Sequence, residues 1–169
     1  MLVAKSYRGN HLAQLQLVAR RVRKEYICLC HGTLAPAPRL FEAPLRMQGR
    51  LAELSDTGKA ARTELLSAAH LDSFSLTRLR LHTGRTHQIR AHLAAAGWPL
   101  VGDVAYGGQW RPWCTRNFLH ACRLALDLGD GPLEAVAELP PDLLDSLKRL
   151  GPMNAHSRAL ARVWVQREG

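Results

Sequence analysis

Residues 82–93 read His-Thr-Gly-Arg-Thr-His-Gln-Ile-Arg-Ala-His-Leu, and this stretch is the most informative part of the chain. Five of its twelve side chains are basic or imidazole, and its glycine opens a turn before an amphipathic run. The spacing predicts a short helix over residues 88–96, with Ile89 and Leu93 facing inward. Arginine binds phosphate or carboxylate through two parallel hydrogen bonds, and the first amides of a helix favour an anion. The stretch therefore predicts a polyanion-binding loop, although an ordinary basic hairpin-to-helix connection would have the same pattern.

Composition agrees with a phosphate-rich partner. The chain has 169 residues, of which 47% are apolar, and a formal net charge of +9. This length and apolar content indicate one domain with a core of its own. A basic excess attracts polyanions through counterion release and long-range steering, although it also serves solubility. Because no signal peptide is visible and no apolar run approaches the roughly 18–20 residues of a membrane span, we expect a soluble intracellular protein without membrane contact.

Other kinds of site are disfavoured by their spacing. Cys28 and Cys30 lie in a strand-like run without a Cys-x-x-Cys pair, so we expect buried core residues and not a zinc ribbon. His87 and His92 are five positions apart, which does not match the i, i+4 pair of a helical zinc site. Gly58-Lys59 lacks the flanking residues of a phosphate loop. The sequence therefore predicts no metal, no nucleotide cofactor and no nucleotide hydrolysis.

The periodicity of the chain alternates between strand and helix patterns. Residues 24–33 are apolar on both faces, as a central strand would be, and residues 74–81 change apolar parity, which suggests a bulge. Residues 55–58 form a plausible turn. The remaining strands are expected at 60–69, 118–128 and 134–139, and the remaining helices at 140–150 and, more weakly, 159–165.

The first helix is predicted from Asn10, as its N-cap, to about Arg21, with Leu12, Leu15, Ala19 and Val22 on one stripe. The C-terminal end of this helix is basic, because four of the five residues 20–24 are cationic: Arg20, Arg21, Arg23 and Lys24. Cations at the C-terminal end of a helix stabilise the helix dipole, and the same cations would suit RNA. The sequence leaves both explanations open.

Several motifs, in order along the chain, closely resemble those of the RluA family of RNA pseudouridine synthases. The segment TGRTHQIRAHL at 83–93 matches the family signature nearly letter for letter. The other similar segments are MLVAK at 1–5, KEY at 24–26 with Gly32, GKAART at 58–63, GWPLVGDVAYG at 97–107 and FLHA at 118–121. The resemblance spans about residues 1–140.

The resemblance implies an α+β fold, with a mixed, mostly antiparallel β-sheet and flanking helices. Residues 1–140 would form a pseudouridine synthase-like domain that is incomplete at its N-terminus, and residues 141–169 a C-terminal helix and tail. The RNA cleft would cross one face of the sheet.

The resemblance also implies the activity, which is the isomerisation of uridine to pseudouridine in RNA without cofactor or metal. Tyr26 matches the tyrosine that stacks on the flipped base, and Arg90 matches the arginine that pairs with the catalytic aspartate. Asp103 matches a structural aspartate. For His92 two alternatives stay open: it contacts the RNA, or it is an ordinary surface residue. The residues expected to bind substrate or RNA are Arg85, Thr86, His87, Gln88, Ile89, Leu119 and Lys24.

The family's catalytic aspartate lies in a loop resembling HRLDxxTSG, which we expect upstream of Met1. The chain by itself is thus expected to be a poor candidate for a stable, active enzyme. Three functions are weighed: part of a pseudouridine synthase, an inactive RNA-binding remnant, and an interaction module whose partner supplies missing strands. The partner is expected to be RNA, whether ribosomal, transfer or messenger. A complete protein is expected to be monomeric.

Overall fold

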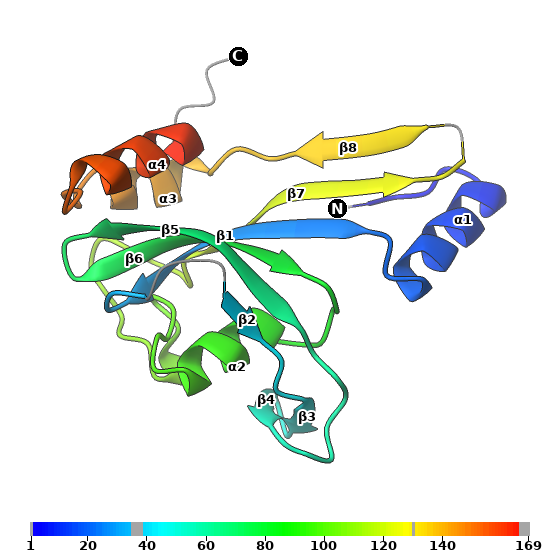
Figure 1. The fold of residues 1–169 in the computed structure, drawn as a ribbon, viewed down its shortest axis with the longest axis horizontal. Helices are drawn as coiled ribbons and strands as arrows, with labels where there is room; N and C mark the ends of the chain where they lie inside the picture. The colour runs from blue at the N-terminus through cyan, green and yellow to red at the C-terminus, as the bar shows by residue number, and fades with distance from the viewer. Residues whose placement is uncertain (1, 35–38, 130, 166–169) are drawn as a thin grey trace.

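The computed structural model describes residues 2–34, 39–129 and 131–165 (Figure 1). Its elements, in chain order, are α1 (Tyr7–Val18), β1 (Arg23–His31), β2 (Arg39–Phe41), β3 (Leu45–Gln48), β4 (Leu51–Leu54), β5 (Thr63–Leu71), β6 (Phe74–Leu81), α2 (Gln88–Ala95), the 3₁₀ turn η1 (Val104–Tyr106), β7 (Leu119–Asp127), β8 (Pro132–Val136), α3 (Pro141–Leu147) and α4 (Ala155–Val165). None of the helices in this part of the chain is both long and apolar enough to span a bilayer.

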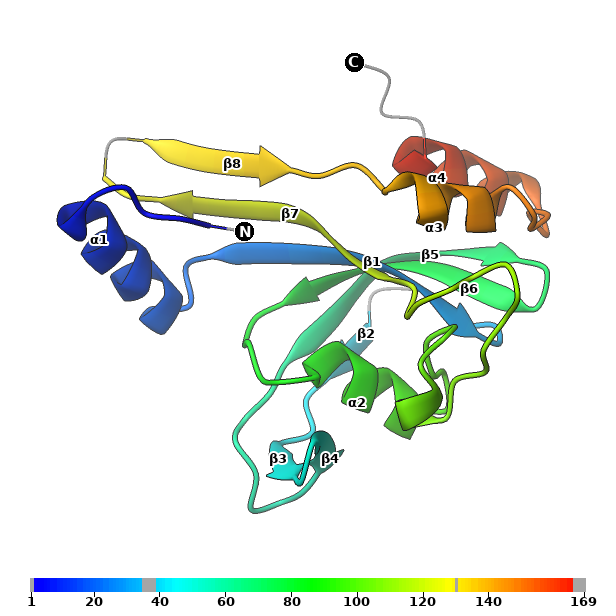
Figure 2. The same ribbon diagram turned by 180° about the vertical axis from the view of Figure 1, so that it is seen from behind.

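Six strands form one sheet in the order β2-β5-β6-β1-β7-β8, and each neighbouring pair in it is antiparallel. Figures 1 and 2 show α2 on one face of this sheet and α3 with α4 on the other. A separate hairpin, β3–β4, lies beside α2, while α1 lies at the opposite end of the sheet from α3 and α4. The expected fold class, α+β with a mostly antiparallel sheet and flanking helices, is confirmed.

Strand β1 is central, and its apolar character on both faces has the expected cause. Cys28 and Cys30 face α2 and belong to the cluster that includes Ile89 and Leu93. Ile27 and Leu29 alternate with them and pack on the other face, in the cluster that α3 completes with its buried leucines. The prediction that the two cysteines are core residues is confirmed, since both are fully buried.

The irregularity predicted within residues 74–81 lies on the partner strand. Register between β5 and β6 shifts between Leu65 and Ser67, opposite Leu79 and Arg78, so the additional residue belongs to β5. Strand β6 itself is continuous and is largely buried from both sides. The change of apolar parity therefore reflects packing on both faces, which is the property of a central strand.

The first helix differs from the prediction in its cap and its stripe. Ser6, and not Asn10, caps the helix, because its hydroxyl accepts a hydrogen bond from the backbone N–H of Gly9 at 3.1 Å. The helix ends at Val18, and Leu15 is half exposed. The predicted stripe is correct only at Val22, which is buried together with Ala13 against Leu126 of β7, whereas Leu15 and Ala19 are exposed.

Strands β2, β3 and β4 were not predicted, because three or four residues are too few to show an alternating pattern. The turn predicted at 55–58 is confirmed by a hydrogen bond of 2.7 Å from the N–H of Gly58 to the carbonyl of Ser55. The closely spaced prolines Pro36 and Pro38 predict a loop, and both lie outside the described residues. Helix α4 begins at Ala155, four residues before the predicted start.

Candidate active-site cleft

Gln88 anchors the signature loop between β6 and α2. It is buried, and its carbonyl oxygen accepts hydrogen bonds from the Thr83 hydroxyl at 2.7 Å and the Arg85 N–H at 3.0 Å. Its amide nitrogen donates to the carbonyl of Arg62 and to the hydroxyl of Thr63, both at 3.0 Å. These four bonds use the full capacity of a side-chain amide. Gln88 therefore holds the loop against the start of β5.

His92 continues the same network into the core. Its Nε2 lies 2.9 Å from the carbonyl oxygen of Ala43, and its Nδ1 lies 2.9 Å from the hydroxyl of Thr63. A carbonyl only accepts, so Nε2 carries the proton and Nδ1 of the neutral ring accepts from Thr63. Burial lowers the pKa of His92, and the bond to Ala43 opposes this in part. His92 is thus an interior residue, and the alternative of a surface position is wrong.

Arg90 is paired with Asp103. Its Nε and Nη2 donate to the two carboxylate oxygens of Asp103, each at 2.6 Å. Asp103 is 1% exposed, and the Arg90 side chain is 16% exposed. The hydrogen bonds from Arg90 to Asp103 raise the pKa of Arg90, and burial opposes this in part. The guanidinium also lies over the ring of Tyr106, 4.6 Å from its centroid. Its orientation is therefore fixed on two sides.

Tyr106 connects this ion pair to the β3–β4 hairpin. Its hydroxyl accepts from the N–H of Ala52 at 2.7 Å and donates to the carbonyl of the same residue at 3.1 Å. The Nδ1 of His87 lies 3.1 Å from the same hydroxyl, and the two rings meet edge to face. His87 adopts a left-handed backbone conformation, with φ of 54°. The last loop residue, the ion pair and the hairpin thus meet at one tyrosine.

Tyr26, Ile89 and Leu119 meet in one apolar cluster on the α2 face of the sheet. Ile89 is buried, whereas Tyr26 and Leu119 are partly exposed at its margin. Burial raises the pKa of Tyr26, and the nearby Cys122 contributes in the same direction. An aromatic ring at the margin of an apolar cluster offers a flat surface on which a base can stack.

Two hollows lie beside these residues. Lys24 and Tyr26 line one of about 400 Å³, together with apolar residues of α1, β7 and β8. Arg85 and Thr86 line another of about 520 Å³, and Arg46 and Lys59 add positive charge to it.

Lys24 joins the two hollows. Its Nζ lies 3.3 Å from the point that a Cβ on Gly84 would occupy, and Gly84 lines the second hollow. Burial lowers the pKa of Lys24. A Cβ on Gly84 would meet the end of the flexible lysine side chain, so the close approach shows that the ammonium group lies against the loop. The lysine therefore connects the tyrosine-bearing hollow to the basic one.

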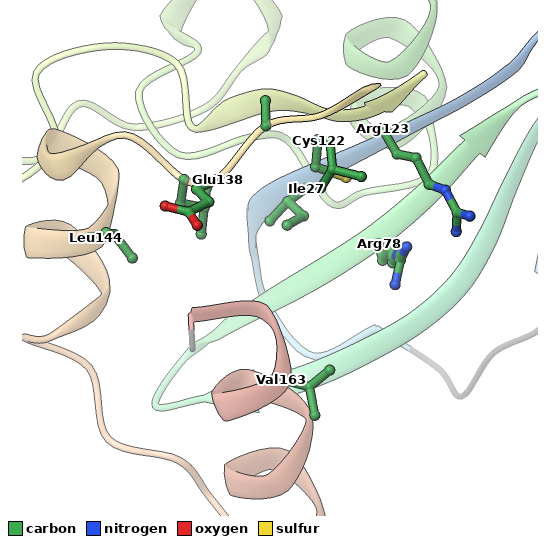
Figure 3. A pocket seen from close by; sticks show the side chains of 10 residues that line it. Ile27, Arg78, Cys122, Arg123, Glu138, Leu144 and Val163 are labelled. Carbon is green, nitrogen blue, oxygen red and sulfur yellow. The ribbon is translucent and has the colours of Figure 1, made fainter. Parts of the chain in front are cut away.

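A smaller cavity of about 110 Å³ lies on the other face of the sheet, between the β7–β8 side and helices α3 and α4 (Figure 3). Its two arginines are engaged within the protein: Arg78 binds Glu25 at 2.6 Å and Arg123 binds Glu134 at 2.8 Å. None of the residues predicted for the site lines it.

The structure thus places the predicted residues on one face but in different surroundings. Tyr26, Ile89 and Leu119 are brought together, and Lys24 lies next to the signature loop. Arg85 and Thr86 line a separate hollow. Sequence reasoning missed the supporting contacts made by Thr63, Thr83, Tyr106 and Asp103. Of these, only the Gly-Asp-x-x-Tyr-Gly spacing was a visible signal.

The chain is similar in sequence to known RNA pseudouridine synthases. The family model described as RNA pseudouridylate synthase matches residues 1–95. An uncharacterised RNA pseudouridine synthase of Chloroflexus aurantiacus is 39% identical over 142 residues, which cover 80% of this chain and 44% of the relative. Ribosomal large subunit pseudouridine synthase D of Yersinia pestis is 32% identical over 167 residues, which cover 89% and 51%. The chain spans about half the length of these curated relatives.

A solved structure has the same fold. The human RNA pseudouridylate synthase domain containing 1 superposes with a TM-score of 0.76 and 24% identity, over 99% of this chain and 76% of that protein. At this identity the likeness concerns the fold alone.

Proposed function

Because the chain belongs to the RNA pseudouridylate synthase family, we propose that it takes part in converting uridine to pseudouridine in RNA. The observation that carries the proposal is the family match over residues 1–95, which includes Tyr26 and the signature loop. The reaction is an isomerisation. The bond from C1′ to N1 breaks, a bond from C1′ to C5 forms, C5 loses its proton and N1 gains one.

Tyr26 is proposed to stack on the target base after it leaves its helix. Base flipping costs a few kcal/mol, and a stacking contact contributes about 1–3 kcal/mol. The partly exposed position of Tyr26, above Ile89 and beside Leu119, supports this role. These two apolar residues would form the wall of the base pocket.

Arg90 is proposed to orient the family's nucleophilic carboxylate. Asp103 is not proposed as this nucleophile, because it is buried and both its oxygens accept hydrogen bonds from Arg90. With Nε and Nη2 directed at Asp103, the Nη1 edge of the guanidinium stays available to a second carboxylate. Asp103 would then be a positioning residue.

The polyanion contacts are proposed to come from Lys24, Arg85, Thr86 and His87. Arg85 already donates to the carbonyl of Ala60 through Nε, at 3.0 Å, which leaves its terminal nitrogens for a phosphate. Gln88 is proposed to act by positioning Arg85 and not by contacting RNA, because its amide is fully bonded within the protein.

The test is pseudouridine formation in a uridine-containing RNA stem-loop. Because the product has the mass of the substrate, it is detected by carbodiimide labelling and reverse-transcriptase stops. The assay compares the 169-residue chain with the protein purified from its native cells. We expect product from the native protein, and none after Arg90→Ala or Tyr26→Leu. Arg149→Gln, a change at an exposed residue just after α3, is the control.

RNA binding without product, in both the chain and the native protein, would contradict the enzymatic proposal. It would favour the alternative of an RNA-binding protein without chemistry. Salt-dependent binding that is lost with Arg85→Gln would then define that function.

A further inference from the structure

A second basic hollow lies outside the cleft described above. It has a volume of about 240 Å³ and lies where α1 ends and where β1 begins beside the end of β6. Its polar lining consists of Arg20, Arg21, Arg23, Arg80 and His82. No other charged side chain lines it among the described residues.

The charges at this hollow are only partly compensated. Glu25 is fully buried beneath it and binds Arg23 and Arg78, while Arg80 lies 3.8 Å from the same carboxylate. Glu64 lies 3.4 Å from Arg80 and 2.9 Å from His82.

Arg20 and Arg21 differ from the other arginines there. Within residues 2–34, 39–129 and 131–165, neither of them lies within ion-pair distance of a carboxylate. The buried carboxylate thus holds the inner arginines in place, and two outer arginines add uncompensated charge.

The backbone at Arg20 is a second and independent observation. Helix α1 ends with hydrogen bonds from the N–H of Arg20 to the carbonyl of Leu17 and from the N–H of Arg21 to the carbonyl of Gln16. This arrangement places Arg20 in the left-handed region, with φ of 56°. Glycine is the usual residue at such a position, because it has no Cβ to crowd the backbone. An arginine here is unfavourable for the turn, and strained residues gather at functional sites.

The hollow lies next to the signature loop along the chain. His82 lines it, and Gly84 and Arg85, two and three residues later, line the basic hollow beside α2. Lys24, which follows Arg23 in β1, lies against Gly84. Positive charge therefore extends from the signature loop around the end of β1 and β6 to the C-terminal end of α1.

We propose that this hollow binds a backbone phosphate of the RNA, on the strand that leaves the base pocket. The inference rests on the proposed function, since it assumes an RNA substrate, and adds a contact outside the cleft. Arg20 and Arg21 would fork onto the phosphate oxygens, while Arg23 and Arg80, held by Glu25, would supply fixed charge behind them. Such contacts position the RNA without reading its sequence.

The test is equilibrium binding of a fluorescently labelled RNA stem-loop to the 169-residue chain, at several salt concentrations. The decisive variant is Arg20→Gly with Arg21→Gln. Glycine suits the left-handed turn, so thermal unfolding should occur at the same temperature or higher. We expect Kd to rise about 10-fold near 0.1 M salt, and the slope of log Kd against log salt to fall by about 1–2.

Two single variants complete the design. Arg85→Gln should weaken binding through the cleft, and Arg149→Gln, which removes an exposed charge at the far end of the sheet, should bind as the wild type does. Wild-type Kd and slope in the double variant, with weaker binding in Arg85→Gln, would overturn the second contact alone. A change of log Kd in Arg149→Gln that is half or more of the change in the double variant would overturn it as well, because the double variant removes two charges and net charge alone would then explain both losses. Failure of the wild type to bind RNA would overturn this inference and the RNA-binding part of the proposed function together.

Discussion

Arg90 and Asp103 form a two-point ion pair in which each guanidinium–carboxylate contact measures 2.6 Å. The carboxylate is supplied by the loop between α2 and β7, and it is buried beneath the arginine. Tyr106 covers the guanidinium from the side. The arginine of the signature is therefore held in one orientation by this chain's own residues.

Removal of the Asp103 charge should destabilise the protein. In Asp103→Asn, Arg90 keeps its charge in a largely buried position without its partner, and the loss of one member of a buried pair costs about 3–5 kcal/mol. Because Arg90 retains 16% exposure, we expect a loss near the lower end of this range, about 3 kcal/mol, in urea unfolding. The control is Asp145→Asn, which removes an exposed carboxylate paired with Lys148. Equal stability of the two variants would contradict a structural role for the pair.

Gln88→Ala should lower the free energy of unfolding more than the same change at an exposed glutamine. It removes four hydrogen bonds, made with the hydroxyls of Thr63 and Thr83, the carbonyl of Arg62 and the N–H of Arg85, and a hydrogen bond contributes about 0.5–1.5 kcal/mol net. We expect a loss of about 2–4 kcal/mol in the free energy of unfolding, since some groups will find water. Gln14→Ala, on the exposed side of α1, should change it by less than about 0.5 kcal/mol. A loss equally small in Gln88→Ala would refute the anchoring role.

His92 should make stability dependent on pH on the acid side. Burial lowers its pKa in the folded state, so the unfolded chain binds the proton more readily. Its contribution is complete above the unfolded value, about 6.5, and is lost as pH falls from there through the lowered folded value. His31 also has a pKa lowered by burial, so the wild type alone does not isolate His92. We therefore compare urea unfolding of wild type and His92→Gln at pH 8 and pH 5. Stability should fall more between these values in the wild type, and parallel pH profiles would speak against the assignment.

The stability of the sheet should depend on Glu25, although this residue lies outside the proposed cleft. Burial alone would raise its pKa, but the hydrogen bonds and charges of Arg23 and Arg78 prevail and hold the pKa below its ordinary value. Glu25→Gln would leave these arginines around a neutral group. We expect a loss of about 3–5 kcal/mol in denaturant unfolding. Glu42→Gln, an exposed carboxylate 3.4 Å from Arg62, should be near neutral. If both variants unfold alike, the buried carboxylate has no special role.

The long elements were predictable because each carries a repeated local pattern. The predictions for β1, β6 and α2 agree with the structure to within two residues at each end, since β1 and β6 are apolar runs typical of central strands and α2 has apolar residues at helical spacing. Short strands such as β2 have too few residues for a period. The cap of α1 was missed because Ser6 and Asn10 are both good caps, and only the docking of the helix distinguishes them.

The candidate site was predictable only as a set of residue types. The signature loop was visible in the sequence from its basic residues, and Tyr26 only from the resemblance of its segment to the family. The roles of Gln88 and His92 were not, since both depend on Thr63, in a strand 25 residues from Gln88 and 29 residues from His92. No local pattern records a hydrogen bond between elements that meet only after folding.

By itself, the sequence determined the family, the mostly antiparallel α+β fold and the position of the basic signature loop, because these follow from motif, period and charge along the chain. Tertiary structure alone decided that Asp103 is the partner of Arg90, that Gln88 and His92 face the interior, and that the charges of Arg20 and Arg80 gather at one hollow. The physical reason is that burial and pairing of polar groups depend on which elements meet, and antiparallel packing joins segments that are distant in the chain.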